Sequence, residues 1–305
     1  MGGDLLQQWG IKVHRSRGET VRRALLGEGA IDPALRLRTE GEYLILPLTS
    51  FRAGAERFDF ETLPATGELI RHELIGGIAL AQECDPEGAL QLLSSRPSLH
   101  TVLFAQSAVE GKYRTRRFEV LAGEQTTKTR YQEYGLRFDI DLAQVYFSAR
   151  LSEERQRILR DSSSGERVLD MFTGVGPFAI TLSRKATVVV ACDINPAAVD
   201  LLIHNIALNK RRNVVSVLAD AARLPGMVRG SFDRIIMNLP IESSAYLPVA
   251  RTLCAPGGTI HFYALQERTG EYLPLINGLG CSEVTERVVR TYSPGKWHAV
   301  YDIHT

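Results

Sequence analysis

Three apolar segments, each ending in polar residues, follow one another between residues 168 and 240 and carry the side chains best suited to chemistry. They are VLDMFTGVGPF at 168–178, VVVACDINP at 188–196 and RIIMNLP at 234–240. Buried parallel strands have this pattern, because their carboxyl ends open on a ligand crevice at one edge of the sheet. The segments therefore predict an α/β fold with a doubly wound, Rossmann-like sheet that binds a nucleotide.

The glycines of the first segment indicate what this crevice would hold. Gly174 and Gly176 allow a tight backbone turn close to a ligand, and a helix beginning at Pro177 would direct its N-terminal amides toward it. The same segment passes as a loose G-x-G-x-x-A dinucleotide fingerprint, with Asp193 near the distance expected of a ribose-binding acid. A tight strand–helix turn without a ligand is the plainer interpretation of an isolated glycine pair.

Two later strand ends separate these possibilities. Asp220 ends the strand at 215–219 and is placed for the amino group of an adenine. Asn238-Leu239-Pro240 is close to the Asn-Pro-Pro turn of methyltransferases that act on amino groups. A nicotinamide enzyme has no use for this turn, whereas a methyl acceptor must be held beside the sulfonium at that strand end. The pattern therefore favours S-adenosylmethionine over NAD.

A series of short motifs runs through nearly the whole chain, from near Gly10 to Asp302. They are GKYR (111–114), LAGE (121–124), EYG (133–135), VYFS (145–148), Glu154-Arg155, DMFTGVGPF (170–178) and MNLP (237–240). Taken in order, these motifs resemble the archaeal and eukaryal type of tRNA (guanine37-N1) methyltransferase. Two positions depart from that family's usual residues, with Ala149 in place of proline and Thr173 in place of alanine.

The resemblance implies methyl transfer to N1 of guanosine 37, which needs two kinds of group. N1 carries a proton at neutral pH, so methylation requires a general base and a donor that stabilises negative charge on O6. The resemblance assigns these roles to Glu154 and Arg114, with Asp141 and Glu133 as the next carboxylates to test. By charge pattern alone, Glu154 would lie on an ordinary charged helical face and Arg114 would be a phosphate contact or a solvated charge.

Three further residues are expected to act on the target base. Tyr146 would position it or pack in a strand, Asn238 would contact the guanine edge, and Pro240 would shape the turn that holds Asn238. The implied cofactor is S-adenosylmethionine, and no metal is required, because the sulfonium brings its own leaving group. The residues expected to bind the donor are Asp170, Phe172, Gly174, Gly176, Pro177, Phe178, Asp193, Ile194, Asp220, Ala221 and Asn238.

Composition agrees with these expectations without establishing them. The chain has 305 residues, 44% of them apolar, and a formal charge of +1, so contact with tRNA would depend on local basic patches. Residues 111–160 supply one, with 11 Lys and Arg against 7 Asp and Glu, although such a run is as often a solvated face. We expect a monomer that binds the anticodon loop and the elbow of tRNA.

Cysteine and histidine spacing gives no sign of disulfides or metal. The four cysteines, Cys84, Cys192, Cys254 and Cys281, lack C-x-x-C pairing, and the seven histidines show no ligand spacing near them. Residues 1–30 hold no apolar signal core, and no apolar run reaches membrane-spanning length. The chain is therefore expected to be a soluble, cytoplasmic protein without membrane contact.

The order of element patterns predicts three domains and a linker. Residues 1–50 are expected to form a small tRNA-contacting α/β module, 51–67 a linker, 68–152 a basic α+β middle domain that binds RNA, and 153–305 the methyltransferase domain. The first module should contain a strand at 11–13, a helix at 18–26 and two strands around Glu40-Gly41.

The middle domain has its own predicted elements. These are strands at 77–81 and 101–105, a helix opened by Asp85 and ending at Ser95, and a basic hairpin system that reaches Phe147. A helix at 152–160 then leads into the methyltransferase domain, where strands and helices alternate.

Two alternative functions stay open. The first is a wyosine-pathway enzyme of the same fold that acts on the modified base at position 37, by methylation or by aminocarboxypropyl transfer, or a bifunctional member that performs both methylations. The second is a non-catalytic tRNA-binding protein with a vestigial donor site. The motif at 238–240 together with Glu154 and Arg114 favours N1-methylation, and the intact donor set speaks against the second alternative.

Overall fold

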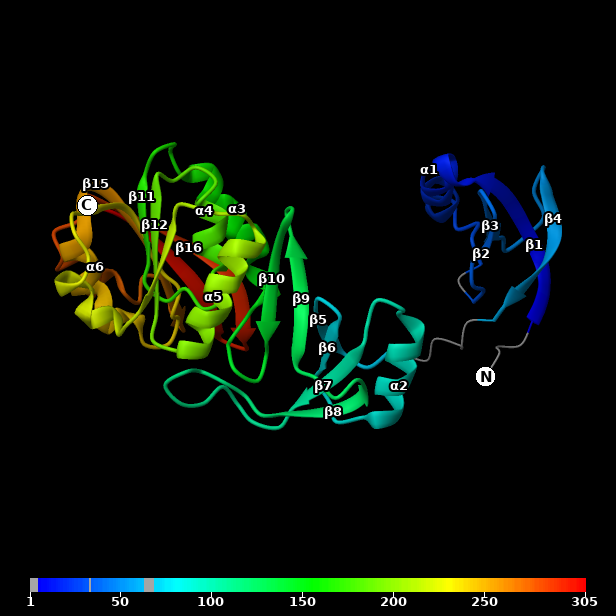
Figure 1. Ribbon diagram of the computed structural model, residues 1–305, viewed down its shortest axis with the longest axis horizontal. Coiled ribbons are helices and arrows are strands. Elements are labelled where there is room, and N and C mark those ends of the chain that lie inside the picture. Colours follow the sequence, from blue (N-terminus) through cyan, green and yellow to red (C-terminus); the bar gives the residue numbers. More distant parts are fainter. Residues whose placement is uncertain (1–4, 33, 63–68) are drawn as a thin grey trace. The chain divides into compact units, whose positions relative to one another are not determined.

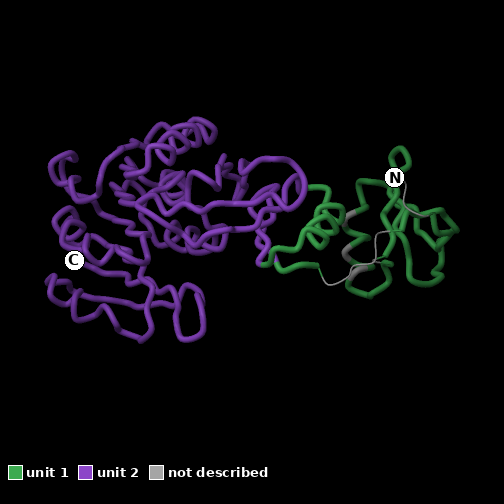
Figure 2. The backbone as a smooth tube through the Cα atoms, turned by 90° about the horizontal axis from the view of Figure 1, so that it is seen from below, with its two compact units in different colours: residues 1–71, 83–98 green, residues 72–82, 99–305 purple. Residues whose placement is uncertain are grey.

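The structure is a computed structural model that describes residues 5–32, 34–62 and 69–305. It contains two compact units, coloured separately in Figure 2. Unit 1 comprises residues 1–71 and 83–98, and unit 2 comprises residues 72–82 and 99–305. Within the described residues, no helix is long and apolar enough to span a membrane.

Unit 1 is built around a four-stranded antiparallel sheet in the order β2-β3-β1-β4. Its elements are β1 (Leu5–His14), α1 (Arg15–Gly27), β2 (Arg38–Glu40), β3 (Tyr43–Pro47) and β4 (Ala55–Glu61), with α2 (Pro86–Ser95) also assigned to this unit. Apolar side chains that include Leu25, Leu46 and Leu48 form a small core of their own. The predicted strand, helix and hairpin are confirmed, although the helix starts three residues earlier than expected.

The prediction of a linker at 51–67 is wrong for much of its length. Strand β4 lies inside it and pairs with β1 from Leu5 to Ile11. Only Phe58 and Phe60 interrupt the polar residues of this strand, so its alternation is too short to stand out from a loop. Phe60 is buried in a cluster with Leu35 and Ile45. The rest of the predicted linker, 63–67, lies outside the described residues.

A second four-stranded sheet, β5-β6-β7-β8, and a separate hairpin make up the first part of unit 2. The strands are β5 (His72–Ile75), β6 (Ile78–Ala81), β7 (Thr101–Ala105), β8 (Phe118–Gly123), β9 (Lys128–Glu133) and β10 (Leu136–Asp141). The predicted strands at 77–81 and 101–105 are confirmed and run parallel. The predicted helix α2 is confirmed too, with Asp85 accepting a hydrogen bond from Gly88 N at its N-terminus.

The boundary expected between residues 152 and 153 does not separate compact units. Phe138 of β10 shares one apolar core with Val168 and Phe178 from the following domain. The side chains of Asn205 and Asn209 in a later helix hydrogen-bond to the backbone of β10. An isolated two-stranded hairpin is barely stable in water, so β9 and β10 depend on that helix for support.

The largest element of unit 2 is a seven-stranded sheet in the order β13-β12-β11-β14-β15-β17-β16 (Figure 1). Its strands are β11 (Arg167–Asp170), β12 (Val188–Asp193), β13 (Val214–Leu218), β14 (Phe232–Met237), β15 (Cys254–Gln266), β16 (Glu283–Ser293) and β17 (Lys296–His304). The first five strands in this order run parallel, and β17 pairs antiparallel with both β15 and β16. The order reverses at β11, where sheets of this type bind their ligands.

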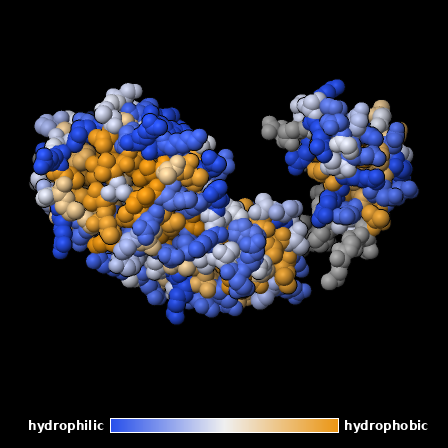
Figure 3. Space-filling model, viewed as in Figure 1, coloured by the Kyte–Doolittle hydropathy of each residue, from blue (hydrophilic) through white to orange (hydrophobic). Residues whose placement is uncertain are grey.

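Helices cover both faces of this sheet, as the doubly wound prediction requires. They are α3 (Ser152–Asp161), α4 (Pro177–Leu182), α5 (Pro196–Leu208), α6 (Leu247–Leu253) and α7 (Leu273–Asn277), with short 3-10 turns η1 (Ala149–Leu151), η2 (Ala221–Gly226) and η3 (Ser243–Tyr246). Val168 packs with α3, α4 and α5, and its neighbour Leu169 packs with α6 on the other face. On the side shown in Figure 3, apolar side chains gather on part of unit 2, among hydrophilic ones.

Candidate functional site

A cavity of about 230 Å³ opens at the carboxyl ends of the central parallel strands. It brings together most of the residues predicted from the sequence, which come from segments far apart in the chain. The predicted residues that line it are Arg114, Tyr146, Phe172, Gly174, Pro177, Asp193, Ile194, Asp220, Ala221, Asn238 and Pro240. Four predicted residues do not line it, namely Glu154, Asp170, Gly176 and Phe178.

The loop after β11 is shaped by its two glycines. Gly174 has a φ of 55° and Gly176 a φ of 93°, a left-handed conformation that favours glycine. A Cβ at Gly176 would lie 2.4 Å from Leu202 of α5, so this glycine allows close packing against that helix. A Cβ at Gly174 would meet only the carbonyl oxygen of Tyr146, at 3.8 Å, and so would be tolerated by the surrounding space. Gly174 therefore borders the cavity, while Gly176 supports the loop from behind.

Asp193 ties this loop to the end of β12. Its Oδ2 accepts a hydrogen bond of 2.7 Å from Gly174 N, and its Oδ1 accepts one of 2.9 Å from Asn195 N. Burial raises the pKa of Asp193 above its usual value, and the bonds from these backbone N–H groups oppose that rise. Each carboxylate oxygen still has a lone pair for a ligand. At the end of β13, Asp220 accepts a hydrogen bond from Ala222 N and also faces the cavity.

Asp170 lies beneath the loop and not in the cavity. It is 1% exposed, and neither carboxylate oxygen has a hydrogen-bond partner among the described residues. Burial raises the pKa of Asp170 to about 7. Asp170 is not among the residues that line the cavity, so its expected contact with the donor stays a prediction.

Arg114 and Tyr146 also line the cavity. Arg114 ends a turn in which its N–H donates to Gly111 O, and its own φ is 55°. This conformation is uncommon for a residue with a side chain, and such residues are frequent at functional sites. The guanidinium carbon lies 6.0 Å from the centre of the Tyr146 ring. A cation and an exposed aromatic ring therefore line the same cavity as the loop around Gly174.

The turn at 238–240 is fixed through its backbone. Pro240 O accepts a hydrogen bond from Leu265 N, and Leu239 O accepts one from Ser243 N. The Ser243 hydroxyl donates to Tyr263 O in the adjacent strand β15. These bonds hold Asn238 and Pro240 at the cavity, as the sequence analysis predicts.

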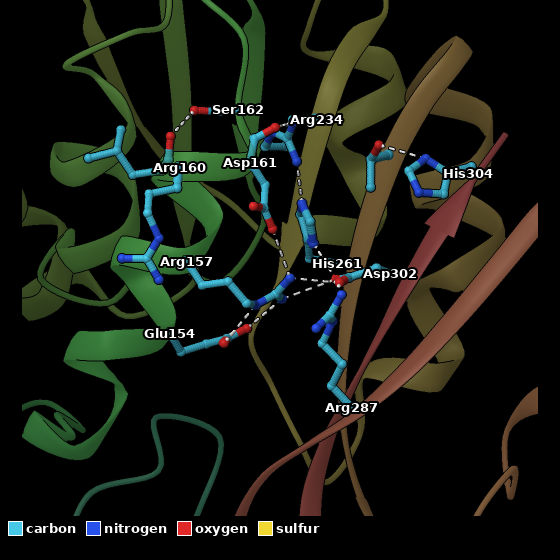
Figure 4. Close-up of polar contacts among 12 residues, drawn as sticks. Glu154, Arg157, Arg160, Asp161, Ser162, Arg234, His261, Arg287, Asp302 and His304 are labelled. Carbon is cyan, nitrogen blue, oxygen red and sulfur yellow. Dashed lines mark hydrogen bonds and ion pairs between the residues drawn. The ribbon is translucent and has the colours of Figure 1, made fainter.

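Glu154 is not among the residues that line the cavity, although its neighbour Arg155 is. Glu154 belongs to the first turn of α3, and Arg155 is the next residue of this helix. The Glu154 carboxylate accepts hydrogen bonds from Arg157 at 2.7 and 2.9 Å (Figure 4) and from the Tyr263 hydroxyl at 2.7 Å. The structure therefore shows a carboxylate that two donors hold beside a residue of the cavity lining.

Asp141 and Glu133, the next carboxylates to test as the general base, have other partners. Glu133 forms a buried ion pair with Arg155, in which both side chains are at most 3% exposed. Asp141 accepts hydrogen bonds from Thr127 and Gln144, at 2.6 and 2.7 Å. Neither lines the cavity. Both carboxylates stabilise the hairpin region and are poorly placed to reach a base.

The cavity also contains residues that sequence reasoning missed. Tyr246 meets Phe172 edge-on at 5.1 Å, and Glu242 adds a third carboxylate to Asp193 and Asp220. No motif marks Tyr246 or Glu242, since they reach the site only through the fold of the segment after β14. Asn195 had a usable signal, because an Asn-Pro pair typically begins a helix, and its side chain does cap α5.

Comparisons with known proteins agree with this arrangement. Residues 129–273 match the TRM5/TYW2 methyltransferase domain, and residues 10–56 match the tRNA methyltransferase 5 N-terminal domain. A relative named tRNA (guanine(37)-N(1))-methyltransferase Trm5b, from Pyrococcus abyssi, is 34% identical, and the match covers 96% of this chain and 97% of the relative.

Two solved structures resemble the chain as well. The complex of aTrm5 and tRNALeu matches with a TM-score of 0.73 and 28% identity over 99% of both chains. M. jannaschii TYW2 in complex with AdoMet matches with a TM-score of 0.59 and 27% identity, over 77% of this chain and 98% of that one. The match to the Pyrococcus abyssi relative, at 34% identity, covers nearly all of both proteins. This chain therefore belongs to the TRM5/TYW2 family of methyltransferases.

Proposed function

We propose that this protein transfers the methyl group of S-adenosylmethionine to N1 of guanosine 37 in tRNA. One observation carries the proposal. A single cavity joins the nucleotide-binding strand ends around Asp193 to the cation, aromatic ring and amide of Arg114, Tyr146 and Asn238. The first set suits a methyl donor and the second suits a purine, and the chemistry requires both to meet at one point. Matches in both the catalytic and the N-terminal segments support the same function.

The donor side fits S-adenosylmethionine. Asp193 has lone pairs left for the ribose hydroxyls, and Gly174 leaves its neighbourhood open to a ligand. Asp220, Ile194 and Ala221 would surround the adenosine. When bound, the sulfonium supplies an activated methyl group, and the residues of the chain bind and align it. Phe172, Pro177 and Asn238 complete the proposed donor site, whereas Asp170, Gly176 and Phe178 support it from below.

The acceptor side provides groups for a guanine. Arg114 would stabilise the negative charge that develops on O6, and Asn238 would hydrogen-bond the base edge. Tyr146 would align the ring, and Pro240 would hold the turn that carries Asn238. Within the residues that the structure describes, the guanidinium of Arg114 forms no ion pair with a carboxylate, in contrast to Arg155 and Arg157.

Glu154 is the proposed general base. The N1–H bond breaks, the proton goes to a Glu154 oxygen, and the N1 electron pair attacks the methyl carbon as the bond from carbon to sulfur breaks. Because Glu154 does not line the cavity itself, the guanine edge would have to reach the α3 side of the cavity, where Arg155 lies. Glu242 lines the cavity itself and is the rival for this role.

The tRNA partner is expected to contact both units. The catalytic cavity would take the anticodon-loop nucleotide, and the N-terminal module would bind the elbow. We propose that the protein acts as a monomer in the cytoplasm.

TYW2 proteins have the same methyltransferase domain, so a wyosine-pathway step is the alternative function. TYW2 matches 77% of this chain, whereas the Pyrococcus abyssi relative matches 96%. Because the latter match extends through the N-terminal module, we favour N1-methylation over methylation or aminocarboxypropyl transfer on the modified base.

A methyl-transfer assay tests the proposal. Unmodified tRNA transcript and labelled S-adenosylmethionine should yield 1-methylguanosine, identified by nucleoside mass, and a transcript with adenosine at position 37 serves as the control. Transfer of the heavier aminocarboxypropyl group, or activity only on tRNA that already carries the tricyclic base, would contradict it. Donor binding without any transfer would support a non-catalytic tRNA-binding protein.

A further inference from the structure

The side chain of Arg157 bridges two carboxylates from different elements. It donates to Glu154 of its own helix at 2.7 and 2.9 Å and to Asp302 of β17 at 2.7 and 3.2 Å (Figure 4). Both ion pairs are largely buried, with side-chain exposures of 16% for Arg157, 12% for Glu154 and 10% for Asp302. The position of Glu154 is therefore linked to β17 through one guanidinium.

Beyond Asp302 the chain of contacts continues across the sheet. Arg234 donates to Nε2 of His261 at 2.6 Å, and it also pairs with Glu166. Since Arg234 can only donate, Nε2 must accept, and the proton of the imidazole is on Nδ1, which donates to Asp302 at 2.6 Å. His261 is thus neutral and fixes the orientation of Asp302.

Within this chain of contacts, Asp302 and Arg157 favour each other's charged form. Burial would raise the pKa of Asp302, but hydrogen bonds from His261 and Arg157 lower it well below its usual range. Burial would lower the pKa of Arg157, but hydrogen bonds to Glu154 and Asp302 raise it above its usual value. At neutral pH, Arg157 is therefore a cation between two anions. Asp161 and the exposed Arg287 are the other charged groups at its edge.

Tyr263 supplies the remaining donor to Glu154, from strand β15. Burial, and next the negative charge of Glu154, raise the pKa of Tyr263 well above its usual value, so the phenol keeps its proton. It can therefore only donate to this carboxylate. Its ring packs against Phe178 at 5.7 Å, which fixes the hydroxyl in place.

Counting lone pairs on Glu154 shows what these contacts leave free. A carboxylate has about four acceptor positions. Oε1 accepts from both Tyr263 and Arg157, and Oε2 accepts only from Arg157. Within the described part of the chain, one acceptor position is left, and it is on Oε2. We propose that Tyr263, Arg157 and Asp302 are positioning residues that present this one lone pair of Glu154 to the N1 proton of guanine.

The inference rests on the proposed function, in which Glu154 is the general base. It adds that the base is aligned by three elements, α3, β15 and β17, and that the distant residue Asp302 acts through Arg157. A proton transfer of this kind depends on alignment of donor and acceptor. Loss of one aligning group should therefore slow the chemical step and leave substrate binding intact.

Tyr263→Phe is the central test, because it removes only the hydroxyl and keeps the ring against Phe178. With tRNA and S-adenosylmethionine saturating, the single-turnover rate of methyl transfer should fall about tenfold or more, since the lost hydrogen bond is to a charged group. The dissociation constants of both substrates should stay within about twofold of the wild type.

Tyr301→Phe is the matched control. Tyr301 is a buried tyrosine of the same sheet whose hydroxyl donates to Gln266 at 2.7 Å, and its ring packs in the core on the opposite face. It should lose a similar amount of thermal stability and keep the wild-type rate. An equal loss of rate in both variants would overturn the inference, because it would mean that the hydroxyl matters only for the fold.

Asp302→Asn tests the distant member, with Glu166→Gln at the far end of the same chain as its control. Both variants weaken a buried ion pair and should lower Tm. Only Asp302→Asn should also lower the single-turnover rate, because it releases Arg157. A wild-type rate for Asp302→Asn would contradict the role of Asp302.

If Glu154→Gln retained the full rate, the inference would fail, while formation of 1-methylguanosine by the wild type would still uphold the proposed function.

Discussion

The carboxylate of Asp193 and the backbone N–H of Gly174 are joined by a 2.7 Å hydrogen bond that links the ends of two neighbouring parallel strands. The same carboxylate orients Asn195, which caps the helix after β12. One side chain thereby sets the shape of the donor loop and presents its remaining lone pairs to a ligand.

Replacement of Asp193 should therefore affect the donor above all. Asp193→Ala removes charge-assisted hydrogen bonds worth about 1.5–3 kcal/mol, so the affinity for S-adenosylmethionine should fall at least about tenfold. Calorimetric titration measures this directly. Binding of tRNA should be nearly unchanged in a filter assay, and an unaltered donor affinity would refute the placement of Asp193.

The second prediction concerns the general base. Glu154→Gln keeps the shape of the side chain and loses its basicity, so the single-turnover rate should fall by about 10²–10⁴ with both substrates still bound. Glu153→Gln is the control, because Glu153 is the adjacent, exposed carboxylate of the same helix. A normal rate for Glu154→Gln combined with a large loss in Glu242→Gln would assign the role to Glu242.

The third prediction is that Glu133 stabilises the fold through its buried ion pair with Arg155. Glu133→Gln leaves the buried guanidinium of Arg155 without its counter-charge, which typically costs about 3–5 kcal/mol of folding free energy. The variant should unfold at a clearly lower urea concentration than the wild type. Glu267→Gln, which breaks the exposed pair with Lys296, should change the midpoint little. Equal midpoints for the two variants would show that the buried pair is not structural.

The fourth prediction concerns the N-terminal module. Deletion must remove residues 1–62 and not only 1–50, because β4 would otherwise lose its partner β1. The truncated protein should bind whole tRNA more weakly and methylate an isolated anticodon stem-loop as well as the full-length protein does, since the catalytic cavity lies in unit 2. Both should be compared at one salt concentration. Equal loss on both substrates would mean that the module supports folding and does not bind the elbow.

The fifth prediction follows from two buried histidines. Burial, followed by the charges of Arg290 and Arg114, lowers the pKa of His298 to about 4, and burial also lowers the pKa of His261. Below about pH 6.5 the unfolded chain therefore binds protons that the folded chain does not. Stability should fall as the pH drops from 6.5 toward 4.

His298→Gln isolates one contribution to this pH dependence. Its glutamine oxygen can still accept from Arg290, which donates to Nδ1 of His298 in the wild type. The variant should lose less stability than the wild type between pH 7 and pH 4.5, as measured by thermal unfolding. A wild-type slope would show that His298 does not carry the effect.

The strand ends of the site were predictable because their signals are local. Buried parallel strands must be apolar along their length, so the polar residue that ends each run is conspicuous, as at Asp193 and Asn238. Helix starts were equally visible where a capping residue precedes proline, as at Asp85. These features depend on a few consecutive residues, and the structure confirms them.

Long-range contacts were beyond this kind of reasoning. Glu154 accepts a hydrogen bond from Tyr263, and its helical neighbour Arg157 pairs with Asp302, and nothing in the sequence pairs these distant positions. The same holds for the packing of β10 against α5, which moves the edge of the compact unit away from residue 152. Strand β4 was missed because a short polar strand is held by the register of its partner, and its own composition gives little sign of it.

The position of β17 has a consequence for how the protein is made. This strand follows the other six of its sheet in sequence, yet it lies between β15 and β16. While the ribosome is still translating the preceding residues, these two strands lack the partner that separates them, and Arg157 and His261 lack Asp302. Until β17 is made, β15 is therefore the open edge of the catalytic sheet, and β16 has no strand to pair with. The sheet is expected to be completed only after translation has passed His304.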